Sequence, residues 1–282
     1  MPHVELSHGT LHYHDSGAGT PEVFLHGYLM GARLWDPVVH RLAGEFRCLI
    51  PELPFGAHPV PLNPGTDLTA AGLGRLVADF LQALGLTGVI LAGNDSGAAI
   101  AQVVAARHPE RLGGLVLATG DAFDKFPPKP FRPLIVAART GTLTPLLAML
   151  KVRPARSLPT AYGWLTHGRL PHDLIDEWVT AYFAHRGVRR DLRKLTAALG
   201  DDDFMNQIAA ELAAFTKPAL LAWAADDKFF PAEHARRLAA ILPDARLELI
   251  PGSRTWVMRD QPARTAQLIA GLARRAAARQ AA

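Results

Sequence analysis

The amino-acid sequence predicts an α/β fold in which helices cover a mostly parallel sheet of eight strands. Short apolar runs alternate with amphipathic segments, which is the pattern of strands that are each followed by a covering helix. The stretch 121–216 breaks this rhythm, because it has helical patterns and no clear strand. Together these observations predict one α/β core that carries a helical insertion.

The strands are expected where the apolar runs lie. Val4–His14 alternates in two arms around Gly9, which predicts an antiparallel hairpin. Six further strands are expected at Glu22–Leu25, Cys48–Ile50, Gly88–Ala92, Gly114–Ala118, Ala219–Trp223 and Leu247–Ile250.

Amphipathic segments between these runs predict the helices. Pro262 suits the start of the last one, because the first N–H groups of a helix have no partner within it. The expected core helices are Arg33–Ala43, Leu68–Leu84, Ser96–Arg107, Ala232–Ile241 and Ala263–Ala278.

The domain boundaries follow from the break in rhythm. We expect residues 1–120 and 217–282 to form the core and residues 121–216 to form a helical cap. Helical patterns lie around Pro133–Leu150 and Leu174–Arg186. Such caps commonly close over an active site and line its pocket. Prolines crowd the entry to the insertion, at Pro127, Pro128, Pro130 and Pro133.

A strand, a sharp turn and a helix follow one another around Gly93-Asn94-Asp95-Ser96-Gly97. This is the context of a nucleophile elbow, whose central residue is held in a strained conformation. Small residues are needed two positions before and after it. Gly93 and Gly97 flank Asp95 in this way, whereas Ser96 would have Asn94, so the spacing favours Asp95 as the nucleophile. The structural alternative is a glycine-rich turn without chemistry.

Two other strand ends carry groups that such a nucleophile uses. Tyr28 follows the strand end Phe24-Leu25-His26-Gly27, and its backbone N–H, with that of Ser96, would form an oxyanion hole. Asp226 and Asp227 follow the strand Ala219–Trp223, where an acid that orients a histidine is expected. Spacing favours Asp227, although a polar strand exit would look the same.

These segments resemble the α/β-hydrolase superfamily over nearly the whole chain. The aspartate at the elbow is similar to that of the haloalkane dehalogenase and epoxide hydrolase branch. In that branch a carboxylate attacks an electrophilic carbon, and water activated by a histidine hydrolyses the resulting ester. The resemblance implies a cofactor-independent hydrolase with Asp95 as nucleophile and Ser96 and Asp227 beside it.

The chain departs from both groups of that branch. Ser96 stands where dehalogenases usually have tryptophan, and Tyr28 where they often have asparagine or tryptophan. Epoxide hydrolases usually have Phe-Pro in place of Tyr28-Leu29. Their cap tyrosines, which polarise the epoxide oxygen, have counterparts only in Tyr162 or Tyr182, and no motif assigns either.

The position of the family's catalytic histidine holds Thr255, judged by the following Trp256 and by Asp260-Gln261-Pro262. A threonine hydroxyl is not a base near neutral pH. His58 is the first candidate for a replacement, because it lies on the loop after the strand Cys48–Ile50. A packing or surface histidine is the structural alternative, as it is for the cap histidines His167, His172 and His185.

The sequence leaves three functions open: a hydrolase for a small apolar ester, epoxide or alkyl halide; a non-hydrolytic isomerase, lyase or cyclase that uses Asp95 as acid or base; and a degenerate hydrolase that binds without turnover. A fold by itself does not decide between them. Core packing is an equal alternative for every candidate pocket residue, namely His26, Phe123, Trp164 and Trp256, with Phe126, Trp178 and Phe183.

Composition narrows the classes of partner. The net charge of +4 is mild, and the basic residues near 274–279 look like a solvated helix tail, so we expect no nucleic acid partner. No apolar run is long enough for a membrane span, and no signal pattern precedes the first strand. The one cysteine, Cys48, lies in an apolar run, and a cytoplasmic location is expected. No metal-ligand spacing or nucleotide-binding loop is present, and monomer and homodimer stay open.

Overall fold

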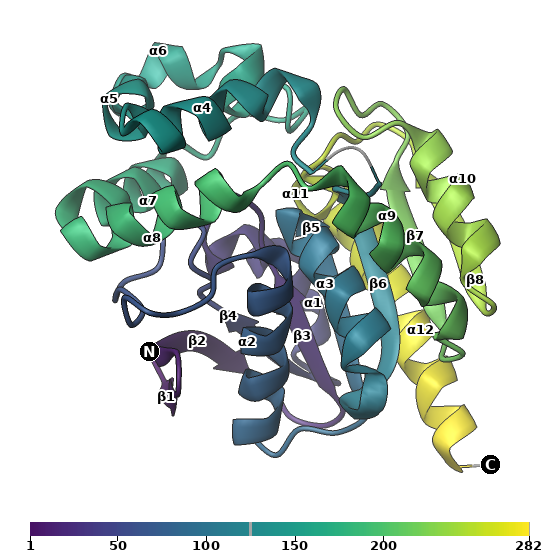
Figure 1. The fold of residues 1–282 in the computed structure, drawn as a ribbon. Coiled ribbons are helices and arrows are strands. Elements are labelled where there is room, and N and C mark those ends of the chain that lie inside the picture. Colours follow the sequence, from purple (N-terminus) through teal and green to yellow (C-terminus); the bar gives the residue numbers. More distant parts are fainter. Residues whose placement is uncertain (124–125, 282) are drawn as a thin grey trace.

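The computed structural model describes residues 1–123 and 126–281, and it contains an eight-stranded sheet in the order β1-β2-β4-β3-β5-β6-β7-β8 (Figure 1). β1 and β2 form the expected antiparallel hairpin, β2 pairs antiparallel with β4, and the remaining neighbours are parallel. The strands are β1 (His3–Leu6), β2 (Gly9–Ser16), β3 (Pro21–Leu25), β4 (Arg47–Pro51), β5 (Val89–Asp95), β6 (Leu112–Gly120), β7 (Ala219–Ala224) and β8 (Ala245–Ile250).

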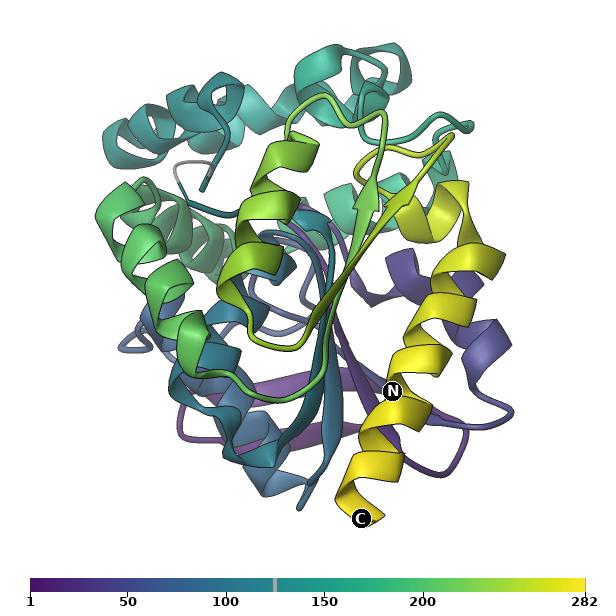
Figure 2. The same ribbon diagram turned by 90° about the vertical axis from the view of Figure 1, so that its right-hand side faces the viewer.

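Helices cover both faces of the sheet, as Figure 2 shows with α10 and α12 on opposite sides of β7 and β8. The helices packed around the sheet are α1 (Asp36–Leu42), α2 (Ala70–Ala83), α3 (Ser96–Arg107), α9 (Asp202–Glu211), α10 (Ala232–Ile241), α11 (Val257–Asp260) and α12 (Pro262–Ala281). Of these, α9 belongs to the stretch 121–216 that was expected to form the cap, and it packs on α3. α2, α9 and the central strands pack against α3, and α1 packs against α12.

Because both faces are covered, β6 is buried along its whole length and β5 along all but its last residue. The predicted fold class, a mostly parallel eight-stranded sheet flanked by helices, is confirmed.

The insertion between β6 and β7 differs in detail from the expectation. The expected helix Pro133–Leu150 is interrupted at Gly141, which adopts the left-handed conformation with φ +81°. The expected helix Leu174–Arg186 ends at Ala184, because His185 is extended. The helices of this segment are α4 (Arg132–Thr140), α5 (Leu143–Leu147), α6 (Arg153–Arg156), α7 (His172–Ala184) and α8 (Arg186–Ala198).

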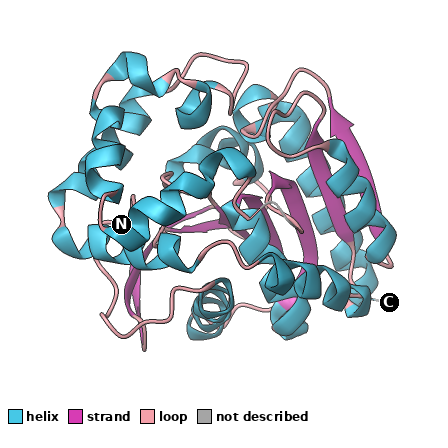
Figure 3. Ribbon diagram, turned by 45° about the horizontal axis from the view of Figure 1, so that its top comes forward, coloured by secondary structure: helices cyan, strands magenta, loops and turns pink. Residues whose placement is uncertain are grey.

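Helices α4 to α8 lie together above the sheet (Figure 1, top), next to the end at which β5 runs into α3. With the top turned forward, the same helices lie in front of the strand ends (Figure 3). Short 3₁₀ or π turns are η1 (Ala32–Trp35), η2 (Pro109–Arg111), η3 (Lys129–Phe131), η4 (Ala148–Lys151), η5 (Pro159–Gly163) and η6 (Leu212–Ala214).

Within residues 1–123 and 126–281, no helix is long and apolar enough to span a bilayer.

The contact between α3 and β3 leaves no room for a side chain at Gly97. A Cβ there would lie 2.5 Å from the Leu25 carbonyl oxygen and 2.6 Å from that of His26. We predict that Gly97→Ala lowers the free energy of unfolding by about 1–3 kcal/mol, because the backbone of β3 must shift. Chemical denaturation measures this change.

Gly271, in the middle of α12, is the matched control. A Cβ there would have no heavy atom within 4 Å. Gly271→Ala should therefore raise the free energy of unfolding by about 0.5–1 kcal/mol, since alanine favours a helix. Equal effects of the two substitutions would contradict the packing described here.

Candidate active site

Asp95 occupies the apex of the turn between β5 and α3, with φ 56° and ψ −129°. This conformation costs a non-glycine residue about 1–3 kcal/mol and persists only where the surroundings impose it. Glycines impose it here. A Cβ on Gly93 would lie 2.3 Å from the Gly97 carbonyl oxygen, and one on Gly120 would lie 2.4 Å from that of Asp95. The predicted elbow geometry, with small residues around Asp95, is confirmed.

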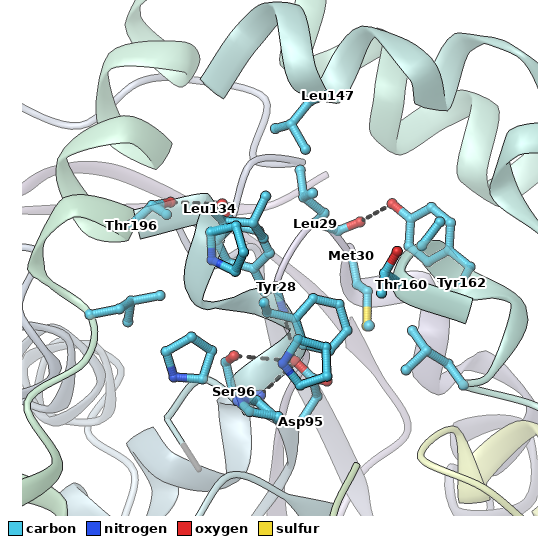
Figure 4. Close-up of a pocket in the computed structure, with 18 of the residues that line it drawn as sticks. Tyr28, Leu29, Met30, Asp95, Ser96, Leu134, Leu147, Thr160, Tyr162 and Thr196 are labelled. Carbon is cyan, nitrogen blue, oxygen red and sulfur yellow. Dashed lines mark hydrogen bonds between the residues drawn. The ribbon is translucent and has the colours of Figure 1, made fainter. Parts of the chain in front are cut away.

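Two backbone N–H groups converge on one oxygen of the Asp95 carboxylate (Figure 4). The Tyr28 N–H donates to Oδ1 over 3.1 Å and the Ser96 N–H over 2.7 Å. Gly27 allows this approach, because a Cβ there would lie 2.4 Å from the Asp95 side chain. Within the described residues Oδ2 of Asp95 has no hydrogen-bond partner, so one oxygen is held and the other is available.

Asp95 lies at the floor of a cavity of about 260 Å³. Its walls are mostly apolar and come from the loop after β3 and from the 121–216 insertion. The polar residues at the cavity are Tyr28, Asp95, Ser96, Asp121, Thr160, Tyr162 and Thr196. The larger apolar ones include Leu29, Met30, Phe131, Leu134, Ile135, Leu146, Leu147, Met149, Leu150, Leu165, Leu199 and Phe230.

Asp227 is tied down away from this cavity. Its Oδ2 accepts a hydrogen bond from the Thr255 hydroxyl over 2.7 Å, and its Oδ1 accepts from the N–H groups of Phe229 and Phe230. Thr255 is fully buried, and neither it nor Asp227 lines the cavity. The structure therefore pairs the two residues that the sequence pattern places opposite each other, with a hydroxyl in place of a ring.

Asp226, the second candidate, accepts a hydrogen bond from the Gly252 N–H and lies 3.3 Å from the His167 ring. It does not contact Thr255. The spacing argument for Asp227 agrees with this geometry.

Asp121 is a residue of the site that the sequence analysis missed. It directly follows β6, the neighbour of β5, so its side chain comes beside the elbow. The Ser96 hydroxyl lies 3.0 Å from its Oδ2 and 3.2 Å from Asp95 Oδ1. The available signal was its position, since parallel strands place their carboxyl ends at one edge of a sheet.

Three carboxyl groups thus lie near the elbow in a poorly solvated region. Burial raises the pKa of Asp95, against the effect of the N–H groups of Ser96 and Tyr28. Burial also raises the pKa of Asp227, partly offset by the Thr255 hydroxyl. The pKa of Asp121 lies well above its usual range, because of burial and then the nearby charge of Asp95.

His58 was expected near Asp95, and this is corrected. The residue is buried, and its Nε2 lies 3.4 Å from Oδ2 of Asp191 in α8. It is absent from the cavity lining. The loop that carries it turns under α8 instead of facing the elbow, so His58 has a packing role.

The pocket candidates His26, Phe123, Trp164 and Trp256 do not line the cavity either. The His26 ring bonds the Gly27 carbonyl and accepts the Leu53 N–H, which shapes the loop before Tyr28. Trp256 is fully buried and packs against Tyr162 and Trp178. His26 and Trp256 therefore contact residues next to the cavity but do not line it.

The other two candidates pack elsewhere. The Phe123 ring lies 5.4 Å from that of His234, between ring centroids, and under the Arg237 guanidinium. Trp164 is partly exposed and lies beside Phe229. No group of three His, Cys, Asp or Glu side chains that could hold a metal ion occurs in the part of the chain that the structure describes.

The Thr255–Asp227 hydrogen bond is testable through stability. We predict that Thr255→Val lowers the free energy of unfolding by about 1–3 kcal/mol, because a buried carboxylate loses a donor. The raised pKa of Asp227 means that the folded state favours its protonated form. Folding therefore loses stability as pH rises through that pKa, and without the hydroxyl the loss is larger.

The destabilisation caused by Thr255→Val should accordingly grow in urea titrations as the pH rises above about 4, the ordinary pKa of an aspartate. Thr255→Ser keeps the hydroxyl and serves as the control. A pH-independent difference between the two variants would show that the hydroxyl does not interact with an ionising Asp227.

The amino-acid sequence was compared with family models and with the sequences and structures of known proteins. The family model described as alpha/beta hydrolase fold matches residues 23–262. Haloalkane dehalogenase 2 of Mycobacterium tuberculosis is 27% identical over 280 residues, covering 94% of this chain and 92% of the relative.

A second relative and a solved structure are also similar to this chain. The 2-hydroxy-6-oxo-6-phenylhexa-2,4-dienoate hydrolase of Burkholderia cepacia is 27% identical, covering 89% of this chain and 86% of its own. The crystal structure of an ancestral haloalkane dehalogenase superposes with a TM-score of 0.79 at 23% identity, covering 99% of this chain and 100% of the other. The chain belongs to the alpha/beta hydrolase fold family.

Proposed function

We propose that the protein is a hydrolase in which Asp95 attacks an electrophilic carbon of a small, largely apolar substrate. The observation that best supports this proposal is that the two oxygens of the Asp95 carboxylate differ in their hydrogen bonds. Oδ1 accepts two backbone N–H groups, whereas Oδ2 has no partner among the described residues and belongs to a side chain that lines the cavity. A carboxylate held in this way is oriented for attack.

The same N–H groups suit the second half of the reaction. Attack through Oδ2 leaves Oδ1 as the carbonyl oxygen of an alkyl ester. When water adds to this ester, negative charge develops on Oδ1, beside the N–H groups of Tyr28 and Ser96. Oriented donors in a site poor in water stabilise such a charge strongly.

The cavity limits the substrate. Its volume of about 260 Å³ and its leucine, proline and phenylalanine walls fit a small apolar molecule. We treat residues 121–216 as the cap that supplies most of these walls. The haloalkane dehalogenase relatives support an electrophilic carbon as target, although Ser96 stands where those enzymes usually have tryptophan.

A non-hydrolytic enzyme or a binding protein is the second candidate, and one observation favours it. Among the described residues that line the cavity there is no histidine. Water activation then needs another base, whereas an isomerisation or elimination with Asp95 as acid or base needs none. The two candidates differ in whether a covalent ester forms.

We predict that 1-bromohexane leaves an alkyl ester on Asp95. The N–H groups of Ser96 and Tyr28 favour the ionised carboxylate against the effect of burial, and a halide leaves without a proton. Acid-quenched samples analysed by intact mass and peptide mapping detect the ester. Asp95→Asn should abolish it.

Glu22→Gln is the matched control, because Glu22 is a buried carboxyl near the start of β3 and outside the cavity. It should leave ester formation unchanged. An adduct on Ser96, or turnover of the halide by Asp95→Asn, would overturn the assignment of the nucleophile. Tight binding of the halide without any ester would favour the second candidate.

A further inference from the structure

Asp121 has the placement of a reacting group. It is 1% exposed, lines the same cavity as Asp95, and its Oδ1 is buried without a hydrogen-bond partner among the described residues. A buried carboxyl oxygen without a donor is costly unless it is protonated or meets a ligand. Asp121 therefore lines the cavity while one of its two carboxyl oxygens has no donor among the described residues.

The backbone holds Asp121 in place. Its N–H donates to the Asp95 carbonyl over 3.2 Å, and its own carbonyl accepts from the Gln102 side chain over 2.8 Å. Thr119 and Phe123, two residues to either side, have φ values of 53° and 54°, in the left-handed region that ordinary residues avoid. The backbone of this segment therefore fixes the position of the Asp121 carboxyl group, as the elbow fixes that of Asp95.

Asp95 and Asp121 share one donor. The Ser96 hydroxyl lies within hydrogen-bond distance of both carboxyl groups and has one proton to donate. Two carboxylates this close do not both ionise readily, so the pair retains a proton.

The surroundings decide which carboxyl of the pair retains the proton. Asp95 has two backbone N–H donors, and among the described residues Asp121 has no side-chain donor beyond the Ser96 hydroxyl. The pKa directions agree, because that of Asp121 is displaced further upward than that of Asp95. Asp95 is the ionised partner and Asp121 the neutral acid.

The hydroxyl groups of Tyr28, Tyr162 and Thr196 at the cavity are engaged in other hydrogen bonds, and the Thr160 hydroxyl, which also lies at the cavity, is not an acid near neutral pH. The Tyr162 hydroxyl donates to the Leu29 carbonyl over 2.9 Å. The Thr196 hydroxyl donates to the Leu192 carbonyl, so the Tyr28 hydroxyl, 2.7 Å away, donates to Thr196. The hydroxyl of Tyr182, the other cap candidate, pairs with Thr144, and Tyr182 does not line the cavity.

We propose that Asp121 is the acid and base of this site, and that the substrate is a small apolar epoxide whose ring oxygen takes the Asp121 proton. This inference rests on the proposed function and deepens it, because it names the leaving group and the group that replaces the missing histidine. A halide leaves as an anion and needs no proton, whereas an epoxide oxygen is a poor leaving group until it is protonated.

The reaction has two steps, formation of an ester on Asp95 and its hydrolysis. In the first, Asp95 Oδ2 forms a bond to an epoxide carbon, the carbon–oxygen bond of the ring breaks, and its electron pair accepts the Asp121 proton. The products are a hydroxyalkyl ester on Asp95 and an ionised Asp121. In the second, Asp121 accepts a proton from water as the water oxygen adds to the ester carbon.

The resulting intermediate then expels the diol oxygen, which takes a proton from Asp121 or solvent, and the carboxylate of Asp95 is restored together with the proton of the pair. One carboxyl group thus acts first as acid and then as base. Retaining glycosidases divide the work between two carboxyl groups in a comparable way.

The test compares two substrates with the same six-carbon chain, of which one has an epoxide oxygen and the other a halide as the leaving group. We predict that Asp121→Asn slows formation of the Asp95 ester from 1,2-epoxyhexane by about 100-fold or more, since general acid assistance is lost. Ester formation from 1-bromohexane should change by less than about 10-fold, and release of that ester should stall. Rapid acid quench and mass spectrometry follow both reactions.

Glu22→Gln again serves as the matched control, and it should leave both rates unchanged. Equal effects of Asp121→Asn on the two substrates, or no effect on either, would overturn the role of Asp121 while leaving Asp95 as nucleophile. Absence of an Asp95 ester from both substrates in the unmodified protein would instead overturn the proposed function.

A measurement on the unmodified protein covers the case in which Asp121→Asn does not fold. Among the described residues, the ionisable group that faces Asp121 is Asp95 on β5, and the α3 residues that contact it, Ser96 and Gln102, carry no charge. As pH rises through the pKa of Asp121, the epoxide rate should fall relative to the bromide rate. A constant ratio would contradict the proposal.

Discussion

The turn at Asp95 is the constraint on which the site depends. A residue with positive φ at this point aims its side chain away from the sheet and brings the next N–H group, that of Ser96, onto its own carboxylate. The glycines at 27, 93, 97 and 120 are consequences of this geometry, because each is where another segment approaches the turn too closely for a Cβ. Strain at one residue is thus maintained by close packing of four segments.

Among the described residues, no cation contributes to the pKa shifts of the three carboxyl groups at the site. Thr255 offers a neutral hydroxyl to Asp227. Asp227 and Asp95 nevertheless keep several donors each, mostly backbone N–H groups, which stabilise a carboxylate without a counter-ion. Asp121 lacks such backbone donors among the described residues, and its pKa lies well above its usual range.

Much of the fold was predictable, because burial between two helical layers makes strands such as β5 and β6 continuous apolar runs. The elbow was predictable for a related reason, since glycine spacing reports close backbone approach. The remainder of the site depends on side-chain packing across distant segments. Nothing local separates His58, which turns to Asp191, from a histidine that faces the cavity. Asp121 lies at the entrance to the insertion, where no motif marks it.

The prolines at the cavity have a consequence for how the pocket recognises its occupant. Pro127, Pro128, Pro130 and Pro133 all line it, and each fixes one backbone dihedral before anything binds. A wall of this kind loses little conformational entropy when a ligand enters, so affinity is not spent on ordering the chain. Such a pocket selects by the shape it already has. Its specificity is expected to change through single side-chain exchanges at fixed positions, not through rearrangement of the segment that carries them.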